Sequence, residues 1–178
     1  MDRLSYCLVV LLAVFIVAQN VTGRKSSVAH SGREPFIGAW RVVAISDTRP
    51  DGTEVPDLYL GPHPTGLLIY DGTGYLCNGL MNAERAKWVN PSKASKEELA
   101  ASAESYDTYC GTYQVDERQE KIVHHLEIAL DPNLVGLDLV RSYVFDGKRL
   151  RLSGTEGLQP GFKFWTVTFE KVTALSAD

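Results

Sequence analysis

Two adjacent histidines, His124 and His125, are the residues whose type points most directly to chemistry. They stand in the run IVHHLEIAL, whose β-branched and apolar residues predict a strand. Because neighbouring strand residues point to opposite faces, only one of the two imidazoles can face an interior. His124 shares its period-2 face with three apolar residues: Leu126, Ile128 and Leu130. We therefore expect His124 to point inward, either as a general acid or base or as a hydrogen-bonded core histidine.

Arg141 is the second candidate, in the run LVRSYVF, where Leu139, Tyr143 and Phe145 share its face. A guanidinium beside aromatic rings presents a planar fork of donors, which suits a carboxylate or an enolate oxygen of a ligand. Two alternatives are an outward-facing charge and an ion pair with Glu127.

Tyrosines supply a third candidate group. Tyr109 and Tyr113 share one face of the run YCGTY, with Gly111 between them, and a strand glycine often marks a close backbone approach or a bend. A tyrosine combines apolar area with one hydrogen-bonding group, which suits an amphipathic ligand, although both residues also fit as core aromatics. Further aromatic candidates for a cavity are Tyr75, Trp88 and Trp165.

Several function classes lack their usual signals. The chain shows no Ser-His-Asp order, phosphate-binding glycine loop, dinucleotide fingerprint or paired Cys-x-x-Cys motif, so we expect no cofactor. Adjacent strand histidines cannot chelate one ion together and no third ligand has recognisable spacing, so we expect no metal site. A formal net charge of -4 with no basic cluster beyond Arg24-Lys25 disfavours nucleic acid as a partner.

The N-terminus resembles a secretory signal in its physical pattern. Asp2-Arg3 form a charged start, and the apolar run Cys7 to Ala18 is too short to span a bilayer. We predict a signal peptide over 1–23, cut after Gly23 or, alternatively, after Ala18, followed by a flexible leader over 24–34. The protein would then be secreted without stable membrane insertion; a retained membrane anchor is the alternative reading.

Cleavage would leave two cysteines, Cys77 and Cys110. In an oxidising compartment an even count favours one disulfide, whereas two buried thiols on neighbouring strands remain the alternative.

The rest of the chain, 35–173, reads as one all-β domain. Turn signals at Asp71 to Gly74 and at Asp146-Gly147 predict hairpins, and Ser95 to Glu98 is a capping box that predicts a helix over 95–106. The predicted strands are 37–46, 65–70, 75–81, 109–115, 121–130, 139–145, 149–153 and 164–172. Eight strands with short connections suit an antiparallel up-and-down barrel, although a sandwich shares the alternation.

Five segments carry a family resemblance: GAWRVVA, PTGLLIYDGTGYL, YCGTYQVD, VHHLEIALDPNLVG and VRSYVFDGKRLRLSG. In this order they resemble the lipocalin-like domain family of bacteria and fungi over nearly all of 36–172. The resemblance implies a calycin-type barrel, in which Gly38 and Trp40 belong to the Gly-x-Trp signature and Trp40 plugs the closed end. The last strand departs from the wider pattern, because it offers only Lys171 to stack on Trp40. Arg149 or Arg151 is the hypothetical substitute.

Together, these features predict binding, transport or sequestration of a small hydrophobic or amphipathic molecule, with the helix over 95–106 as a partial lid. The expected ligand-binding residues are Tyr109, Tyr113, His124, Arg141 and Tyr143. The alternative from another class is a cofactor-independent isomerase, cyclase or hydratase, in which His124 is the acid or base and Arg141 or a tyrosine holds an oxyanion. A third reading is a secreted effector acting through a protein partner of unknown identity.

Overall fold

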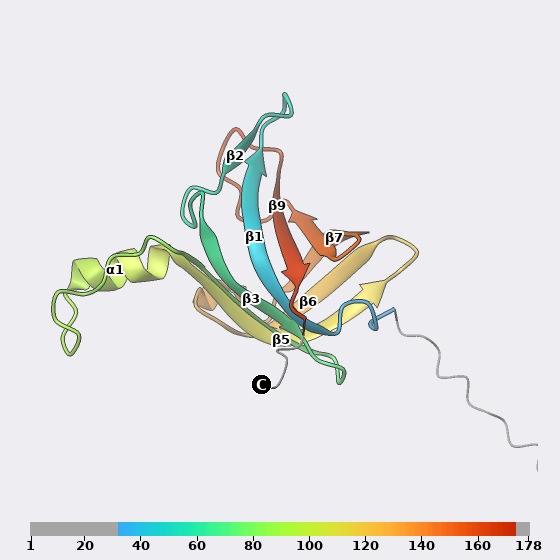
Figure 1. Ribbon diagram of the computed structural model, residues 1–178, viewed down its shortest axis with the longest axis horizontal. Helices are drawn as coiled ribbons and strands as arrows, with labels where there is room; N and C mark the ends of the chain where they lie inside the picture. The colour runs from blue at the N-terminus through green and yellow to red at the C-terminus, as the bar shows by residue number, and fades with distance from the viewer. Residues whose placement is uncertain (1–31, 174–178) are drawn as a thin grey trace, which may run out of the picture.

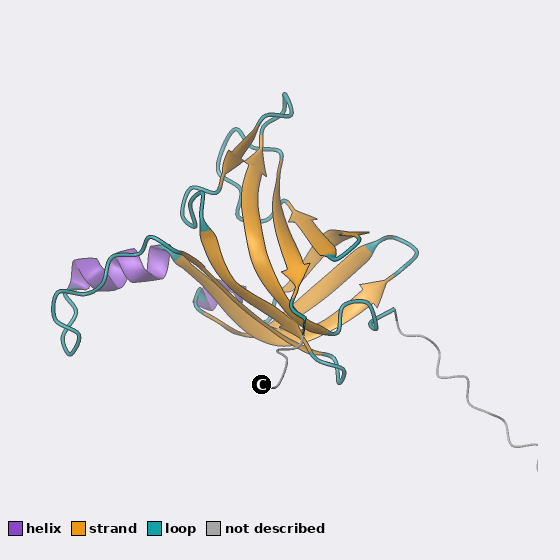
Figure 2. Ribbon diagram, viewed as in Figure 1, coloured by secondary structure: helices purple, strands orange, loops and turns teal. Residues whose placement is uncertain are grey.

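The computed structural model describes residues 32–173, so the predicted signal peptide over 1–23 and most of the leader over 24–34 lie outside the described residues. The strands are β1 (Gly38–Thr48), β2 (Glu54–Pro56), β3 (Pro64–Tyr70), β4 (Tyr75–Asn82), β5 (Tyr106–Asp116), β6 (Lys121–Ala129), β7 (Asp138–Asp146), β8 (Arg149–Gly154) and β9 (Phe164–Lys171). The helix α1 (Lys96–Glu104) separates β4 from β5, and a short 3-10 turn (Pro132–Leu134) follows β6. Strands dominate the described chain (Figure 2).

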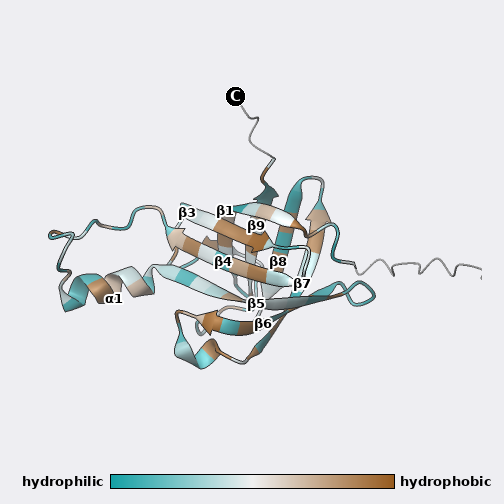
Figure 3. Cartoon of the chain, turned by 90° about the horizontal axis from the view of Figure 1, so that it is seen from below, coloured by the Kyte–Doolittle hydropathy of each residue, from teal (hydrophilic) through white to brown (hydrophobic). Residues whose placement is uncertain are grey.

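The sheet closes on itself. Each strand pairs antiparallel with its neighbour in the order β1-β3-β4-β5-β6-β7-β8-β9, and β1 also pairs with β9 (Figure 1). This closure confirms the predicted eight-stranded barrel and excludes the sandwich. Sequence patterning missed β2, which pairs only with the end of β1; a three-residue edge strand tolerates its proline. Hydrophobic and hydrophilic residues alternate along the strands, as a one-layer wall requires (Figure 3).

The strand β6 changes face partway along its length. The β5–β6 register shifts at Cys110 and Gly111, so Glu127 is an extra residue of a β-bulge. Gly111 permits this close approach, because a Cβ at that position would collide with the carbonyl of His125. Beyond the bulge Ile128 is 67% exposed. The predicted common face of His124 with Ile128 and Leu130 is therefore wrong, and only Leu126 shares it.

One end of the barrel is plugged by aromatic side chains. Phe36 is fully buried and packs edge-to-face against Tyr143 and Phe145, each with a ring-centroid distance of 4.9 Å. Trp40 lies beside them, and its Nε1 donates a hydrogen bond to the Phe36 carbonyl at 2.6 Å. Trp40 therefore occupies the closed end, as the resemblance implied.

The cation above Trp40 is Lys171, whose Nζ lies 4.9 Å from the ring centroid and donates to the Pro35 carbonyl at 3.1 Å. Arg149 and Arg151 are exposed, so the hypothesis that one of them replaces the missing arginine is wrong. A lysine supplies the same cation–π contact in this position.

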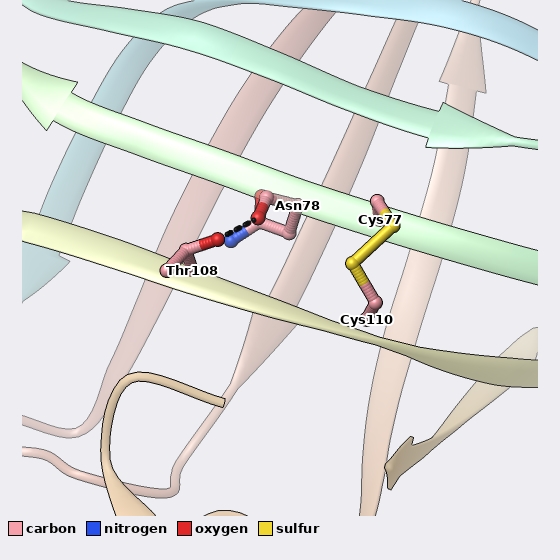
Figure 4. The surroundings of a disulfide bond; sticks show 4 residues. All are labelled: Cys77, Asn78, Thr108 and Cys110. Carbon is pink, nitrogen blue, oxygen red and sulfur yellow. Dashed lines mark hydrogen bonds between the residues drawn. A yellow bond between two sulfur atoms is a disulfide. The ribbon is translucent and has the colours of Figure 1, made fainter. Parts of the chain in front are cut away.

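The connection between β4 and β5 stands away from the barrel in both views, and α1 leads from its outer loop back to β5 (Figures 1 and 3). The capping box forms as predicted, with Ser95 Oγ accepting from the Glu98 amide, but α1 ends at Glu104 and buries no residue. Of the residues of α1, only Glu104 at its C-terminal end lines the cavity, so the expected partial lid is confined to that end. A disulfide joins Cys77 and Cys110, which lie opposite each other within the paired lengths of β4 and β5 (Figure 4).

Candidate functional site

A cavity of about 450 Å³ opens at the end of the barrel away from the aromatic plug. Its walls are built from inward residues of five strands: Leu68, Leu80, Leu139, Leu152, Val167 and Phe169. The mouth is formed by the β2–β3, β6–β7 and β8–β9 connections, which contribute Leu60, Leu134 and Leu158. This volume and its apolar walls match the usual size and character of small-molecule sites.

Polar side chains form the floor of the cavity. Arg141 on β7 and Tyr109 on β5 line it, and His124 on β6 lies directly beneath them, fully buried. Nδ1 of His124 lies 3.0 Å from Nη1 of Arg141 and 3.2 Å from the Tyr109 hydroxyl, while Nε2 lies 2.7 Å from the Tyr70 hydroxyl. Four side chains from four strands thus form one connected polar network.

The partners of His124 fix its protonation. A guanidinium can only donate, so Nδ1 accepts from Arg141 and the imidazole proton lies on Nε2, which donates to Tyr70. Burial lowers the pKa of His124 well below 6.5, and the charge of Arg141 lowers it further. Burial also raises the pKa of Tyr109 to about 12. At neutral pH the network therefore holds a neutral imidazole and protonated phenols.

Arg141 is enclosed by aromatic and acidic groups. Its guanidinium lies 5.5 Å from the ring centroid of Tyr109 and 5.2 Å from that of Trp165. Nη2 lies 3.1 Å from Oε1 of Glu156, which forms an ion pair. The alternative of an ion pair with Glu127 is wrong: Glu127 is the bulged residue on the outer face, whereas Glu156 comes from the β8–β9 connection.

The fold and this internal cavity agree with the comparison against protein families, in which the model of the lipocalin-like domain matches residues 37–172. The chain belongs to the lipocalin-like domain family. A search of the curated proteins finds no match. The lipocalin-like barrel supports small-molecule binding as a general role.

Of the predicted ligand-binding residues, the lipocalin-like barrel brings Tyr109 and Arg141 to the cavity surface and His124 just below it. Tyr113 and Tyr143 do not line the cavity. The Tyr113 hydroxyl donates to the Asp71 carbonyl at 2.9 Å, and Tyr143 packs in the aromatic plug. His125 points outward, with Nδ1 2.7 Å from Asp138.

Of the three additional aromatic candidates, one lines the cavity and two lie at the surface. Trp165 lines the cavity, whereas Tyr75 and Trp88 are exposed at the barrel surface and on the β4–β5 connection. Strand alternation could assign Trp165 its face, but Trp88 lies outside any strand.

Sequence reasoning missed Asp107 and Asn78, which line the cavity beside Tyr109. Asn78 Nδ2 donates to Oδ2 of Asp107 at 2.8 Å, and Thr108 Oγ1 donates to the Asn78 carbonyl at 2.8 Å (Figure 4). Burial raises the pKa of Asp107, although Arg141 and the bond from Asn78 lower it. The available signal was the two-residue step from Asp107 to Tyr109, which places both on one face of β5.

In the described part of the chain, no three His, Cys, Asp or Glu side chains are grouped closely enough to hold a metal ion. Within the same residues, no helix has the length and apolar character needed to cross a membrane.

Proposed function

We propose that this lipocalin-like domain binds a small amphipathic molecule in its cavity and carries or sequesters it. The observation that supports this most directly is the combination of leucine-rich walls with a closed polar floor in one cavity of about 450 Å³. Apolar walls favour burial of a hydrophobic body, and a few convergent polar groups orient it.

The hydrogen bonds in the cavity floor also favour binding over catalysis by His124. The imidazole is covered by Tyr109 and Arg141, and its lone pair is already engaged by the guanidinium. A general base has to reach the proton that it removes. His124 is therefore a positioning residue, which holds Tyr109 and Arg141 in their places.

The binding proposal is tested by a substitution that places a larger side chain in one wall of the cavity. Leu139→Phe enlarges a buried lining residue, whereas Val140→Phe, one position along β7, enlarges an exposed residue on the outer face. Native mass spectrometry of protein purified from its own source would detect a co-purifying compound in the wild type and in Val140→Phe. Loss of that compound in Leu139→Phe supports the proposal. Equal retention by all three proteins, or no bound compound in any of them, contradicts it.

A cofactor-independent enzyme is the second candidate, and one observation favours it. Asp107, Tyr109 and Arg141 converge on one cavity, and the pKa of the Asp107 carboxyl is raised by burial, as in groups that transfer protons. Arg141 and Tyr109 would hold an oxyanion while Asp107 supplies or removes the proton.

Chemical conversion of the bound compound separates these two functions. An enzyme should lose about 10²–10⁴-fold in rate on Asp107→Asn or Arg141→Met. A carrier leaves the compound chemically unchanged in the wild type and in both variants, which is the result expected from the leading proposal.

We propose further that the protein acts outside the cytoplasm. The Cys77–Cys110 disulfide is typical of oxidising compartments and supports this location. N-terminal sequencing of secreted protein should find a start near Arg24. Recovery of an intact Met1 form from membranes would contradict export with cleavage.

A further inference from the structure

Acidic side chains outnumber basic ones around the cavity. One cation, Arg141, is among the lining residues. The carboxylates that line it are Asp47, Asp57, Glu104, Asp107, Asp131 and Glu156. Four of these carboxylates already accept from donors of the protein. Glu156 pairs with Arg141, Asp107 accepts from Asn78, Asp131 accepts from the Asn133 amide at the 3-10 turn, and Asp57 accepts from the Tyr59 and Leu60 amides.

Asp47 has no such role. It lies near the end of β1 and faces inward because a register shift between Val42 and Ala44 moves Ile45 and Asp47 to the interior face. Its exposed fraction is 6%, yet its carboxylate has neither a hydrogen-bond donor nor a cation as partner among residues 32–173. Its oxygens are not fully enclosed by protein and keep access to the cavity, where a donor group of a ligand can reach them.

A second carboxylate adds negative charge beside Asp47. Asp57 follows β2, and its amide donates to the Ile45 carbonyl at 3.3 Å, which holds it beside β1. Its Oδ1 accepts from the amides of Tyr59 and Leu60 at 2.9 and 2.6 Å. Burial raises the pKa of Asp47, and the charge of Asp57 raises it further. A positive charge beside the two side chains would favour their ionised forms and so oppose this rise in the pKa of Asp47.

The neighbourhood favours an organic cation over a metal ion. Asp47 and Asp57 have no third carboxylate, histidine or cysteine close enough to complete a metal site within the described residues. The nearby walls are apolar, with Ile45, Leu60 and Phe169 lining the same cavity. An ammonium group on a hydrophobic body satisfies both features, because its charge meets the carboxylates while its carbon chain displaces water from the walls.

We propose that the cavity selects amphipathic amines, with the ammonium group bound by Asp47 and Asp57 and the apolar body directed toward the leucine-lined interior. This inference rests on the proposed binding function of the cavity and names its ligand class.

Three probes that share one alkyl chain test the inference: octylamine, octan-1-ol and octanoate. At about pH 7.5 the amine is protonated and octanoate is ionised, so the probes differ chiefly in charge. Isothermal titration calorimetry is run on the mature protein, on Asp47→Asn and Asp57→Asn, and on Asp138→Asn as the control. Asp138 is an exposed acid on the outer face of β7. Circular dichroism confirms that each variant is folded.

The wild type and Asp138→Asn should bind octylamine roughly tenfold or more tightly than octan-1-ol, the size expected of a charge-assisted hydrogen bond. Asp47→Asn should abolish this preference while leaving octan-1-ol binding unchanged, and Asp57→Asn should reduce it without disturbing the acceptor of the Tyr59 and Leu60 amides. If octan-1-ol or octanoate binds the wild type as tightly as octylamine does, the amine inference fails while the binding function stands. If none of the three probes binds, both are overturned.

Discussion

The environment of His124 differs strongly from that of an isolated side chain in water. It is neutral and buried, and its two nitrogens are engaged by Arg141 and Tyr70. A histidine whose folded pKa is lowered stabilises the fold above its unfolded value of 6.5. That contribution is lost as the pH falls, since the unfolded chain then binds a proton that the folded chain excludes.

We therefore predict that the free energy of unfolding of the wild type falls below pH 6.5, with a contribution of about 1.4 kcal/mol per pH unit from this one group. His124→Gln should flatten the dependence, whereas His125→Gln, on the exposed partner of Asp138, should keep it. Urea unfolding at a series of pH values measures the slopes. Equal slopes for the two variants would show that His124 does not carry the effect.

Strand alternation predicts which face a residue occupies, but it does not predict depth along the barrel axis. Alternation allows His124, Tyr109 and Arg141 an inward face, and the structure places all three inside. Tyr143 shares a face with Arg141 but lies two residues further along β7, about 6–7 Å at the usual rise of a strand, and so belongs to the aromatic plug. Asp47 and Glu156 could not be found this way, because one depends on a register shift and the other on a loop.

At the scale of single elements, the bulge in β6 decides which residues line the interior. The glycine in YCGTY predicted a close backbone approach, and the structure confirms it at Gly111 against His125. The sequence could not show which residue of the partner strand becomes the extra one. The extruded Glu127 ends the period-2 pattern of β6, so Ile128 lies outside.

Gly111→Ala should destabilise the barrel by about 1–3 kcal/mol, because its new methyl group meets backbone that cannot move without breaking the β5–β6 pairing. Gly72→Ala is the matched control: its Cβ would lie 3.9 Å from Ile37 Cδ1, an ordinary contact. Urea unfolding compares the two variants. A loss in Gly72→Ala as large as that in Gly111→Ala would contradict the close-approach explanation.

The disulfide closes the long connection that carries α1. Its two cysteines are separated by 33 positions, and the segment between them contains the whole excursion away from the barrel. Replacing both by serine should lower the free energy of unfolding by about 3–4 kcal/mol, because the unfolded chain regains the freedom of an open loop. Denaturant unfolding of this variant and of the wild type, each with and without reductant, checks the value; reductant should affect only the wild type.

At the scale of the whole molecule, hairpin turns and alternation predict most of the barrel. Asp71 to Gly74 and Asp146-Gly147 connect β3 to β4 and β7 to β8, as expected. Closure depends on β1 pairing with both β3 and β9, a contact between distant segments that local patterns do not contain. The family resemblance supplied that expectation. The sequence patterns do not single out Phe36, because its role as a plug depends on rings contributed by β7.

A protease can cleave the β4–β5 connection, which carries α1, without releasing either fragment of the chain. Lys93 is exposed in the loop before α1. This loop belongs to the connection between β4 and β5, and these two strands are held together by their pairing and by the Cys77–Cys110 bond. Brief trypsin treatment should cleave there first. The nicked protein should then migrate as one band on a denaturing gel without reductant and as two bands with it, while the cavity keeps its ligand.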